Sequence, residues 1–332
     1  MTGGWRARGR VAWVALWLAC GASQAHGEGR VFGLAGKRVD DVNFVAAWRG
    51  CDAEARAQGD RCLHLGRAGS ANARLQDEAI RMALQEGLAA LAVSVMHSGF
   101  LADHGLAQAR SAGIPVVTFD SDLDWPHRDL RRLYIGPDNH AFGRELGEMV
   151  RRQWPAGGSV CLMSADVHDP NLNQRLAGVR AVLSGLLDRP PARLNGEGGW
   201  TEPARCPWYN GDDPSRARQQ IALSLESLRV QAVVSVGAWP IAEPAAYQQM
   251  LEGLRQRGLD VRRAVFVGTG VLSPQQSLLL RQGHLAGVVE MDFEAMGRAA
   301  FRAMKRLSRG ERLEGVVRTG FKSRLAGAEG GP

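Results

Sequence analysis

Several polar residues directly follow short apolar runs, and their types suit the binding of a small polar molecule. The apolar run at 114–119 ends in Asp120, Ser121 and Asp122. A carboxylate in that position accepts hydrogen bonds from two hydroxyl groups at once, and charged acceptors make the stronger hydrogen bonds. The commoner role of an aspartate there, which remains the alternative, is to cap a turn. All three residues belong to the predicted ligand-binding set.

Two later segments offer hydrogen-bond donors and an aromatic ring. Asn173 and Arg175 start a predicted helix after the strand at 159–163, and their amide and guanidinium groups are donors. Trp239 comes just after the strand at 231–236, and an aromatic ring so placed stacks on the apolar face of a sugar. The alternatives are an N-cap beside a surface arginine in the first segment and a packed core tryptophan in the second.

Two more residues are ligand-binding candidates because they lie at the ends of predicted strands. Thr269 lies between two glycines after the strand at 264–268, where bare backbone lets a ligand or a hinge approach closely. Glu290 ends the strand at 285–289. The sequence contains no nucleophile elbow, HExxH motif or P-loop, and no paired CxxC arrangement for zinc. We therefore predict no catalytic residue, no cofactor and no metal, although carboxylates at strand ends permit acid–base chemistry in principle.

Strand-like and helix-like segments alternate along most of the chain. The run at 88–96 is almost entirely apolar, as a strand buried on both faces should be, and the stretch at 72–86 has its apolar residues on one helical face. Repeated alternation predicts parallel sheets with helices on both faces. About 300 residues are many for one core, so the predicted fold class is α/β with two doubly wound, Rossmann-like lobes. Ligands of such sheets bind outside the carboxyl ends of the strands, where the candidates above lie.

The first 25 residues have the composition of a secretory signal peptide. Three arginines precede an apolar run at 11–19, and small or polar residues follow as far as Ala25. The apolar run is far shorter than the roughly 20 residues that span a membrane. We predict export to the periplasm with cleavage after Ala25, and the alternative is a lipoprotein-like site that leaves Cys20 acylated.

The charge distribution and the cysteine content bear on the functional class of the protein and on its disulfides. The formal charge is +7, and the arginines are scattered among carboxylates with no basic block interleaved with aromatic residues, which argues against nucleic-acid binding. An oxidising compartment permits disulfides among the four cysteines beyond the leader. We pair Cys51 with Cys62 first, because they lie close together on a predicted helix and the strand after it. Buried free thiols are the alternative, and the state of Cys161 and Cys206 is left open.

The order of these segments resembles the type I periplasmic binding proteins, in their ribose-binding-like branch, over residues 30–325. The segment GIPVVTFD at 113–120 resembles the strand end whose aspartate binds ligand hydroxyls in that branch. The segment YIGPDN at 134–139 resembles its first crossover into the second lobe. The segment NQRLAG at 173–178 resembles the polar helix start that carries ligand donors, and GHLAGVVE at 283–290 resembles the approach to the hinge.

The resemblance implies discontinuous lobes that the chain crosses between three times. We place the crossings near Gly136, Glu290 and Thr319. The resulting boundaries are 30–136 plus 291–318 for the N-terminal lobe, 137–290 plus 319–326 for the C-terminal lobe, and 327–332 for a flexible tail.

The resemblance also extends the predicted site. Phe44 is its first-lobe aromatic, with Trp48 one helical turn on as the alternative, and Lys37 and Asn43 join the expected ligand-binding set. Pentose-binding members carry arginine after the strand-end aspartate, where this chain has Ser121. Such departures argue against a pentose and favour a cationic, amino-substituted or hydroxyl-rich ligand.

The predicted function is capture of a sugar, polyol or sugar derivative between the lobes by hinge closure. The expected partner is the membrane permease of an ABC importer, and the chain is expected to be a monomer. One alternative is a periplasmic sensor that reports to a membrane histidine kinase or chemoreceptor, and a less favoured one is a periplasmic enzyme. The leader and the lack of a helix-turn-helix segment argue against a cytoplasmic repressor.

Overall fold

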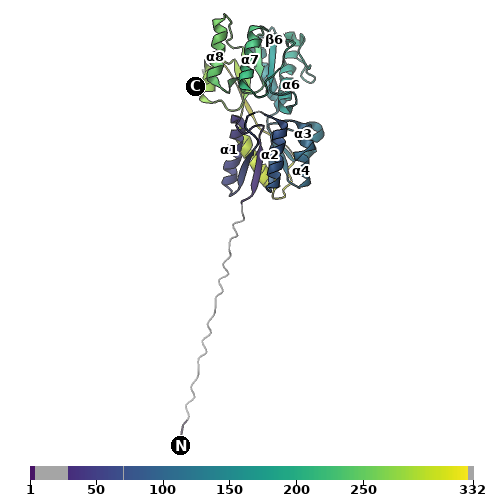
Figure 1. Ribbon diagram of the computed structural model, residues 1–332, viewed down its shortest axis with the longest axis vertical. Helices are drawn as coiled ribbons and strands as arrows, with labels where there is room; N and C mark the ends of the chain where they lie inside the picture. The colour runs from purple at the N-terminus through teal and green to yellow at the C-terminus, as the bar shows by residue number, and fades with distance from the viewer. Residues whose placement is uncertain (4–28, 70, 328–332) are drawn as a thin grey trace.

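The computed structural model describes residues 1–3, 29–69 and 71–327, and Figure 1 shows two lobes built from separate sheets. The predicted signal peptide, with its cleavage site and Cys20, lies outside the described residues, as does the end of the predicted tail from 328 onward. The predicted fold class, α/β with two lobes of mainly parallel sheet, is confirmed by the two sheets and their covering helices.

The first lobe contains a six-stranded sheet in the order β12-β5-β4-β3-β1-β2, with every neighbouring pair parallel. Its strands are β1 (Val31–Ala35), β2 (Arg61–Leu65), β3 (Ala90–Val93), β4 (Val116–Phe119), β5 (Leu133–Gly136) and β12 (Gly315–Arg318). Its helices are α1 (Val42–Arg56), α2 (Ala73–Gln85), α3 (Ser98–Asp103), α4 (Gly105–Ser111), the 3-10 helix η1 (Trp125–Leu130) and α10 (Phe293–Leu307).

The second lobe contains a seven-stranded sheet in the order β13-β11-β10-β9-β6-β7, with β8 also paired to β6. Its strands are β6 (Gly158–Ser164), β7 (Trp200–Thr201), β8 (Trp208–Tyr209), β9 (Ala232–Ser235), β10 (Val265–Thr269), β11 (Gly287–Met291) and β13 (Phe321–Leu325), of which β13 alone runs antiparallel to its neighbour. Its helices are α5 (Asn139–Gln153), α6 (Pro170–Ser184), α7 (Pro214–Glu226), α8 (Pro244–Gln256) and α9 (Pro274–Arg281), with short 3-10 helices η2 (Glu197–Gly199) and η3 (Trp239–Ile241).

The apolar strands form sheets buried on both faces. In β3, Ala90 and Ala92 belong to the apolar cluster that includes α1 and α10, whereas Leu91 and Val93 belong to the cluster under α2 and α4. Helix α10 lies unusually close to α1, because a Cβ atom at Gly297 would be only 1.8 Å from the carbonyl oxygen of Ala47. This close contact holds α10 in the first lobe, although α10 and α1 are far apart in the sequence.

The chain passes between the sheets in three places: after β5, after β11 and between β12 and β13. The segment at 315–325 therefore contains two strands, β12 and β13, that belong to different sheets. The helical stretch at 98–111 is divided into α3 and α4, because His104 has non-helical backbone angles between them.

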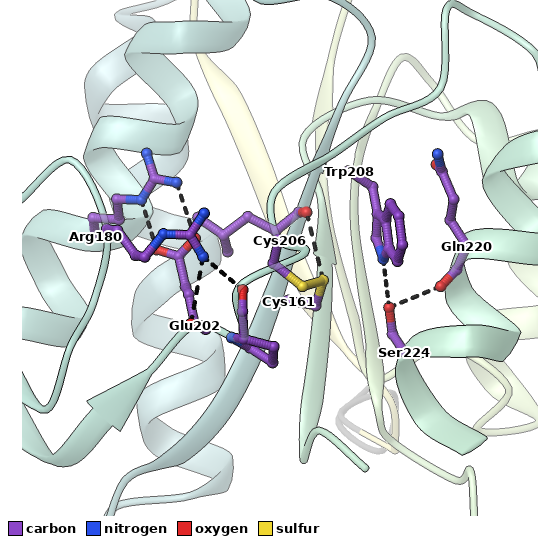
Figure 2. The surroundings of a disulfide bond; sticks show 10 residues. Cys161, Arg180, Glu202, Cys206, Trp208, Gln220 and Ser224 are labelled. Atoms are coloured by element: carbon purple, nitrogen blue, oxygen red, sulfur yellow. Dashed lines mark hydrogen bonds and ion pairs between the residues drawn. A yellow bond between two sulfur atoms is a disulfide. The ribbon is translucent and has the colours of Figure 1, made fainter. Parts of the chain in front are cut away.

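A disulfide lies inside each lobe. Cys51 on α1 is bonded to Cys62 on β2, the pair put first from the sequence. Cys161 on β6 is bonded to Cys206, which precedes β8, and Figure 2 shows this bond beside the buried Arg180–Glu202 ion pair. Both bonds join segments of one lobe, so neither restrains the lobes relative to each other.

The described residues contain neither a membrane-spanning helix nor a cluster of metal ligands. No helix among them combines the length and the apolar character that a membrane crossing requires. Nor do the described His, Cys, Asp and Glu side chains form a group of three or more that could hold a metal ion.

Candidate functional site

A cavity of about 540 Å³ lies between the two lobes, at the carboxyl ends of their strands. Both lobes line it, as the topology of parallel sheets predicts. Of the residues predicted from the sequence, those that line it are Lys37, Asn43, Phe44, Asp120, Arg175, Trp239 and Thr269.

Asp120 is held in an unusual backbone conformation at the end of β4. Its φ is 57°, in the left-handed region that aspartate tolerates better than most residues. Two hydrogen bonds hold this backbone conformation: the Tyr134 hydroxyl and the Asn139 amide donate to the Asp120 carbonyl at 3.0 and 2.9 Å. The Ser94 hydroxyl donates to the Asp120 carboxylate at 2.9 Å. The side chain is thus oriented by first-lobe contacts and by the start of α5.

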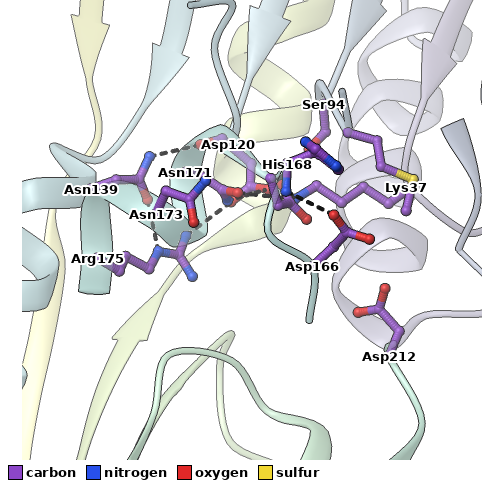
Figure 3. A network of polar contacts seen from close by, with 12 residues as sticks. Lys37, Ser94, Asp120, Asn139, Asp166, His168, Asn171, Asn173, Arg175 and Asp212 are labelled. Carbon is purple, nitrogen blue, oxygen red and sulfur yellow. Dashed lines mark hydrogen bonds and ion pairs between the residues drawn. The ribbon is translucent and has the colours of Figure 1, made fainter. Parts of the chain in front are cut away.

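The Asp120 carboxylate bonds directly to the second lobe, as Figure 3 shows. Asn171 Nδ2 lies 3.2 Å from each carboxylate oxygen, and Arg175 Nη2 donates to Oδ1 at 3.2 Å. Arg175 is further bonded to the Asn139 amide oxygen at 2.8 Å, and its guanidinium lies 4.5 Å from the centre of the Phe142 ring. Burial lowers the pKa of Arg175, and the Asp120 charge opposes that change.

A second cross-lobe contact joins Lys37, just after β1, to the start of α6. Lys37 Nζ donates to Asp169 Oδ1 at 2.5 Å and to Asn171 Oδ1 at 3.0 Å. Burial raises the pKa of Asp169 to about 7, against the opposing effect of the Lys37 ammonium. The other carboxylate oxygen of Asp169 is buried and has no hydrogen-bond partner in the part of the chain that the structure describes. One acceptor in the cavity wall is therefore left available.

Two further carboxylates line the cavity from opposite lobes. Asp41 caps α1 and accepts from the backbone amide of Asn43 at 2.8 Å. Asp212, in the second lobe, accepts from Trp239 Nε1 at 2.6 Å. Burial raises the pKa of both carboxyl groups, and the charge of Asp212 raises that of Asp41 further.

Aromatic rings line the cavity on each lobe. In the first lobe, the buried ring of Phe44 meets Phe293 edge to face, with ring centres 5.8 Å apart. In the second lobe, Trp239 lies against Gly237, where a Cβ atom would be 2.5 Å from the indole ring. Trp48 is not part of this wall, because it stacks on His64 and donates to the Cys62 carbonyl.

Two predicted residues beside Asp120 lie outside the cavity. Ser121 is buried, and its hydroxyl has no hydrogen-bond partner among the described residues. Asp122 forms a two-pronged ion pair with Arg131, at 2.8 and 2.7 Å, and accepts from Thr118 at 2.5 Å. All of these contacts are within the first lobe, so Asp122 anchors the loop after β4.

Two predicted residues of the second lobe also lie away from the cavity. Asn173 donates to the Val167 carbonyl at 2.7 Å and borders a separate cavity of about 430 Å³ near His97. Glu290 accepts from the Leu272 amide at 2.8 Å and forms an ion pair with Arg324 at 2.7 Å. Glu290 therefore ties β11 to its own lobe next to the crossing.

The polar residues that line the cavity and that the sequence prediction missed include Asp169, Asn171, Asp212 and Asp41. The helix was expected to begin at Asn173, whereas α6 begins one turn earlier at Pro170. An aspartate followed by proline is a typical helix start, so Asp169-Pro170 is the signal that identifies the first two.

The model of the family described as periplasmic binding protein domain matches residues 32–312. Among curated proteins, the xylose/arabinose-binding protein XylF of Sulfolobus acidocaldarius is 29% identical over 110 residues. That match covers 31% of this chain and 27% of XylF, about a quarter of its length.

Solved structures of similar fold cover nearly the whole chain. An ABC transporter solute-binding protein from Agrobacterium vitis with bound D-fucose has a TM-score of 0.76 at 15% identity, covering 90% of this chain and 95% of that one. The glucose-galactose binding protein GanP of Geobacillus stearothermophilus has a TM-score of 0.73 at 17% identity, covering 90% and 98%. A Burkholderia graminis solute-binding protein in complex with D-arabinose has a TM-score of 0.73 at 18% identity, covering 89% and 95%. At these identities the likeness establishes the fold.

Proposed function

Because the chain belongs to the periplasmic binding protein domain family, we propose that it captures a sugar-like ligand between its lobes and delivers it to an ABC importer. The observation that carries the proposal is the cavity between the lobes, in which Asp120 and Arg175 come from opposite sides. Residues from both lobes must meet to complete this wall. A ligand held there contacts both lobes at once and favours the closed form.

The chemistry of the cavity wall fits a hydroxyl-rich ring. Each buried hydroxyl needs a hydrogen-bond partner, and the carboxylate of Asp120, the amide of Asn171 and the ammonium of Lys37 offer acceptors and donors. Phe44 and Trp239 supply aromatic surface for the apolar faces of such a ring.

The partner and the compartment follow from the family and the relatives. The family consists of solute-binding proteins without enzymatic activity, and similar solved structures include ABC transporter solute-binding proteins with bound D-fucose or D-arabinose. We propose that this chain likewise acts in the periplasm, that its partner is a membrane permease, and that it releases its ligand unchanged.

Ligand released from the purified protein tests the proposal. The exported chain is isolated from cells, denatured, and the released small molecules are identified by mass spectrometry. The identified compound and a panel of neutral sugars, polyols and amino sugars are then added back in a thermal-shift assay, where a true ligand raises the melting temperature by mass action. Chemical conversion of the compound during incubation, or no response to any member of the panel, would contradict the proposal.

A further inference from the structure

Carboxylates outnumber cationic side chains around the cavity. The acidic residues in its lining are Asp40, Asp41, Asp120, Asp169, Asp212 and Glu243. The basic residues in its lining are Lys37, Arg38 and Arg175. The wall that a ligand meets is therefore electronegative, in contrast to the positive formal charge of the whole chain.

Four of these carboxylates already have a cation. Arg38 binds both oxygens of Asp40, Arg175 contacts Asp120, and Lys37 contacts Asp169. The fourth, Glu243, forms an ion pair with Arg218, which lies outside the lining. No cation in the wall is left over from these pairs.

Asp41 and Asp212 have no ion-pair partner among the described residues. Asp41 accepts a backbone amide bond, and Asp212 accepts the indole N–H of Trp239. They come from opposite lobes, and the charge of Asp212 acts on Asp41 across the cavity. Lys37 and Arg38 offset the raised pKa of Asp212 only in part, and they are already paired with Asp169 and Asp40. Bringing Asp41 and Asp212 together on closure is therefore costly unless a further positive charge lies between them.

A separate observation concerns Asp169. This residue is only 1% exposed, it lines the cavity, and its Oδ2 has no hydrogen-bond partner among the described residues. Its pKa is raised in part by the charge of Asp212, so the two groups are electrostatic neighbours. A buried carboxylate oxygen without a donor is rare in folded proteins, and this one belongs to a residue of the cavity lining.

We infer that the ligand carries a positively charged nitrogen, which binds between Asp41 and Asp212 and donates to Asp169 Oδ2. A protonated primary amine fits, because an ammonium has three N–H donors and no acceptor. The inference deepens the proposed function and depends on it: an amino sugar or amino polyol places its hydroxyls on Asp120 and Arg175 and its nitrogen on this acidic end.

Matched sugars separate the inference from the proposed function. Isothermal titration calorimetry compares D-glucosamine and D-galactosamine with glucose and galactose, and with the neutral N-acetyl forms. We expect the amines to bind roughly tenfold to hundredfold tighter than their neutral counterparts, the range for one hydrogen bond to a charged group. Equal or tighter binding of the neutral sugars would overturn the inference and leave the proposed function intact.

Variants test which carboxylates hold the nitrogen. Asp212→Asn keeps the left-handed backbone accessible, where φ is 59°, and Asp41→Asn keeps a good helix cap. Each is expected to lower affinity for the amine roughly tenfold more than it lowers affinity for the N-acetyl sugar. The matched control is Asp40→Asn, whose carboxylate is already held by Arg38. An equal loss for amine and N-acetyl sugar would refute the assignment.

Amines without a sugar ring complete the panel. Binding of putrescine or ethanolamine together with failure of every sugar would support the cationic site and refute the sugar class of the proposed function. Failure of all amines, with binding of any neutral sugar, would refute the cationic site alone.

Discussion

Asparagine in place of Asp120 tests whether the polar contacts between the lobes hold the cleft closed. The carboxylate and Arg175 belong to different lobes, so their ion pair forms on closure and both groups are hydrated when the lobes separate. In the closed form the variant leaves a buried guanidinium without its counter-charge, at a cost of about 3–5 kcal/mol for a fully broken buried pair.

The free-energy cost in the Asp120→Asn variant should be smaller than for a fully broken pair, because other hydrogen bonds remain. Arg175 keeps its hydrogen bonds to Asn139 and to the Val236 carbonyl, and the asparagine oxygen still accepts from Ser94. We therefore expect about 2–3 kcal/mol, which is a roughly 30- to 150-fold loss of ligand affinity. Calorimetric titration with the ligand identified by mass spectrometry measures it. The melting temperature of the ligand-free variant should change little, since the open form pays no such cost.

Asp122→Asn is the matched control, two residues away in the same loop. Its ion pair with Arg131 is buried but lies wholly within the first lobe. We expect it to lower the melting temperature by several degrees, since breaking this pair costs about 3 kcal/mol in the folded lobe, and to leave affinity unchanged. Unchanged affinity in Asp120→Asn, or an equal loss in Asp122→Asn, would refute the reasoning.

Three further predictions concern pH, the aromatic wall and the second disulfide. Burial raises the pKa of Asp169 to about 7, so between about pH 4 and pH 7 the folded chain holds a proton that the unfolded chain has lost. The free energy of unfolding should therefore fall as pH rises through that window, and thermal melts at pH 5 and pH 8 should show a smaller fall in Asp169→Asn than in the wild type. Trp239→Ala should weaken ligand affinity at least fivefold, corresponding to about 1 kcal/mol of lost ring contact; titration calorimetry that shows no change would remove Trp239 from the site. Replacing both Cys161 and Cys206 by alanine should cost about 4 kcal/mol of stability from loop entropy, seen as an earlier denaturant midpoint, with ligand affinity at 25 °C retained.

The parts of the fold that could be predicted from the sequence are those with a local pattern. The apolar run around β3 and the one-sided apolar face of α2 can be recognised in the sequence, because burial on two faces or one fixes their residue types. The segment at 188–213 gave no such pattern, because β7 and β8 are two residues each and too short to show a period. Helix α7, which follows that segment, was not predicted.

Only those residues of the candidate site that directly follow a recognisable strand could be predicted from the sequence. Asp120 follows from the rule that ligands bind beyond the carboxyl ends of parallel strands. Asp122 has the same residue type in the same loop, and only the three-dimensional position of Arg131 turns it away from the cavity. Asp212 reaches the cavity from a turn after β8, and that two-residue strand is too short to be recognised from the sequence.

The distribution of strong restraints explains why closure can be sensitive to a ligand. Both disulfides and the buried Asp122–Arg131 and Arg180–Glu202 pairs lie within single lobes, and they keep each lobe rigid. The side-chain contacts that line the cavity between the lobes are instead polar pairs, whose groups can exchange partners with water when the cleft opens. A buried ion pair whose two groups are hydrated in the open form contributes little net free energy to closure, because the loss of hydration offsets the attraction. Closure therefore carries only a small intrinsic bias, and a ligand that bonds to both lobes needs only a few kcal/mol of differential affinity to shift it.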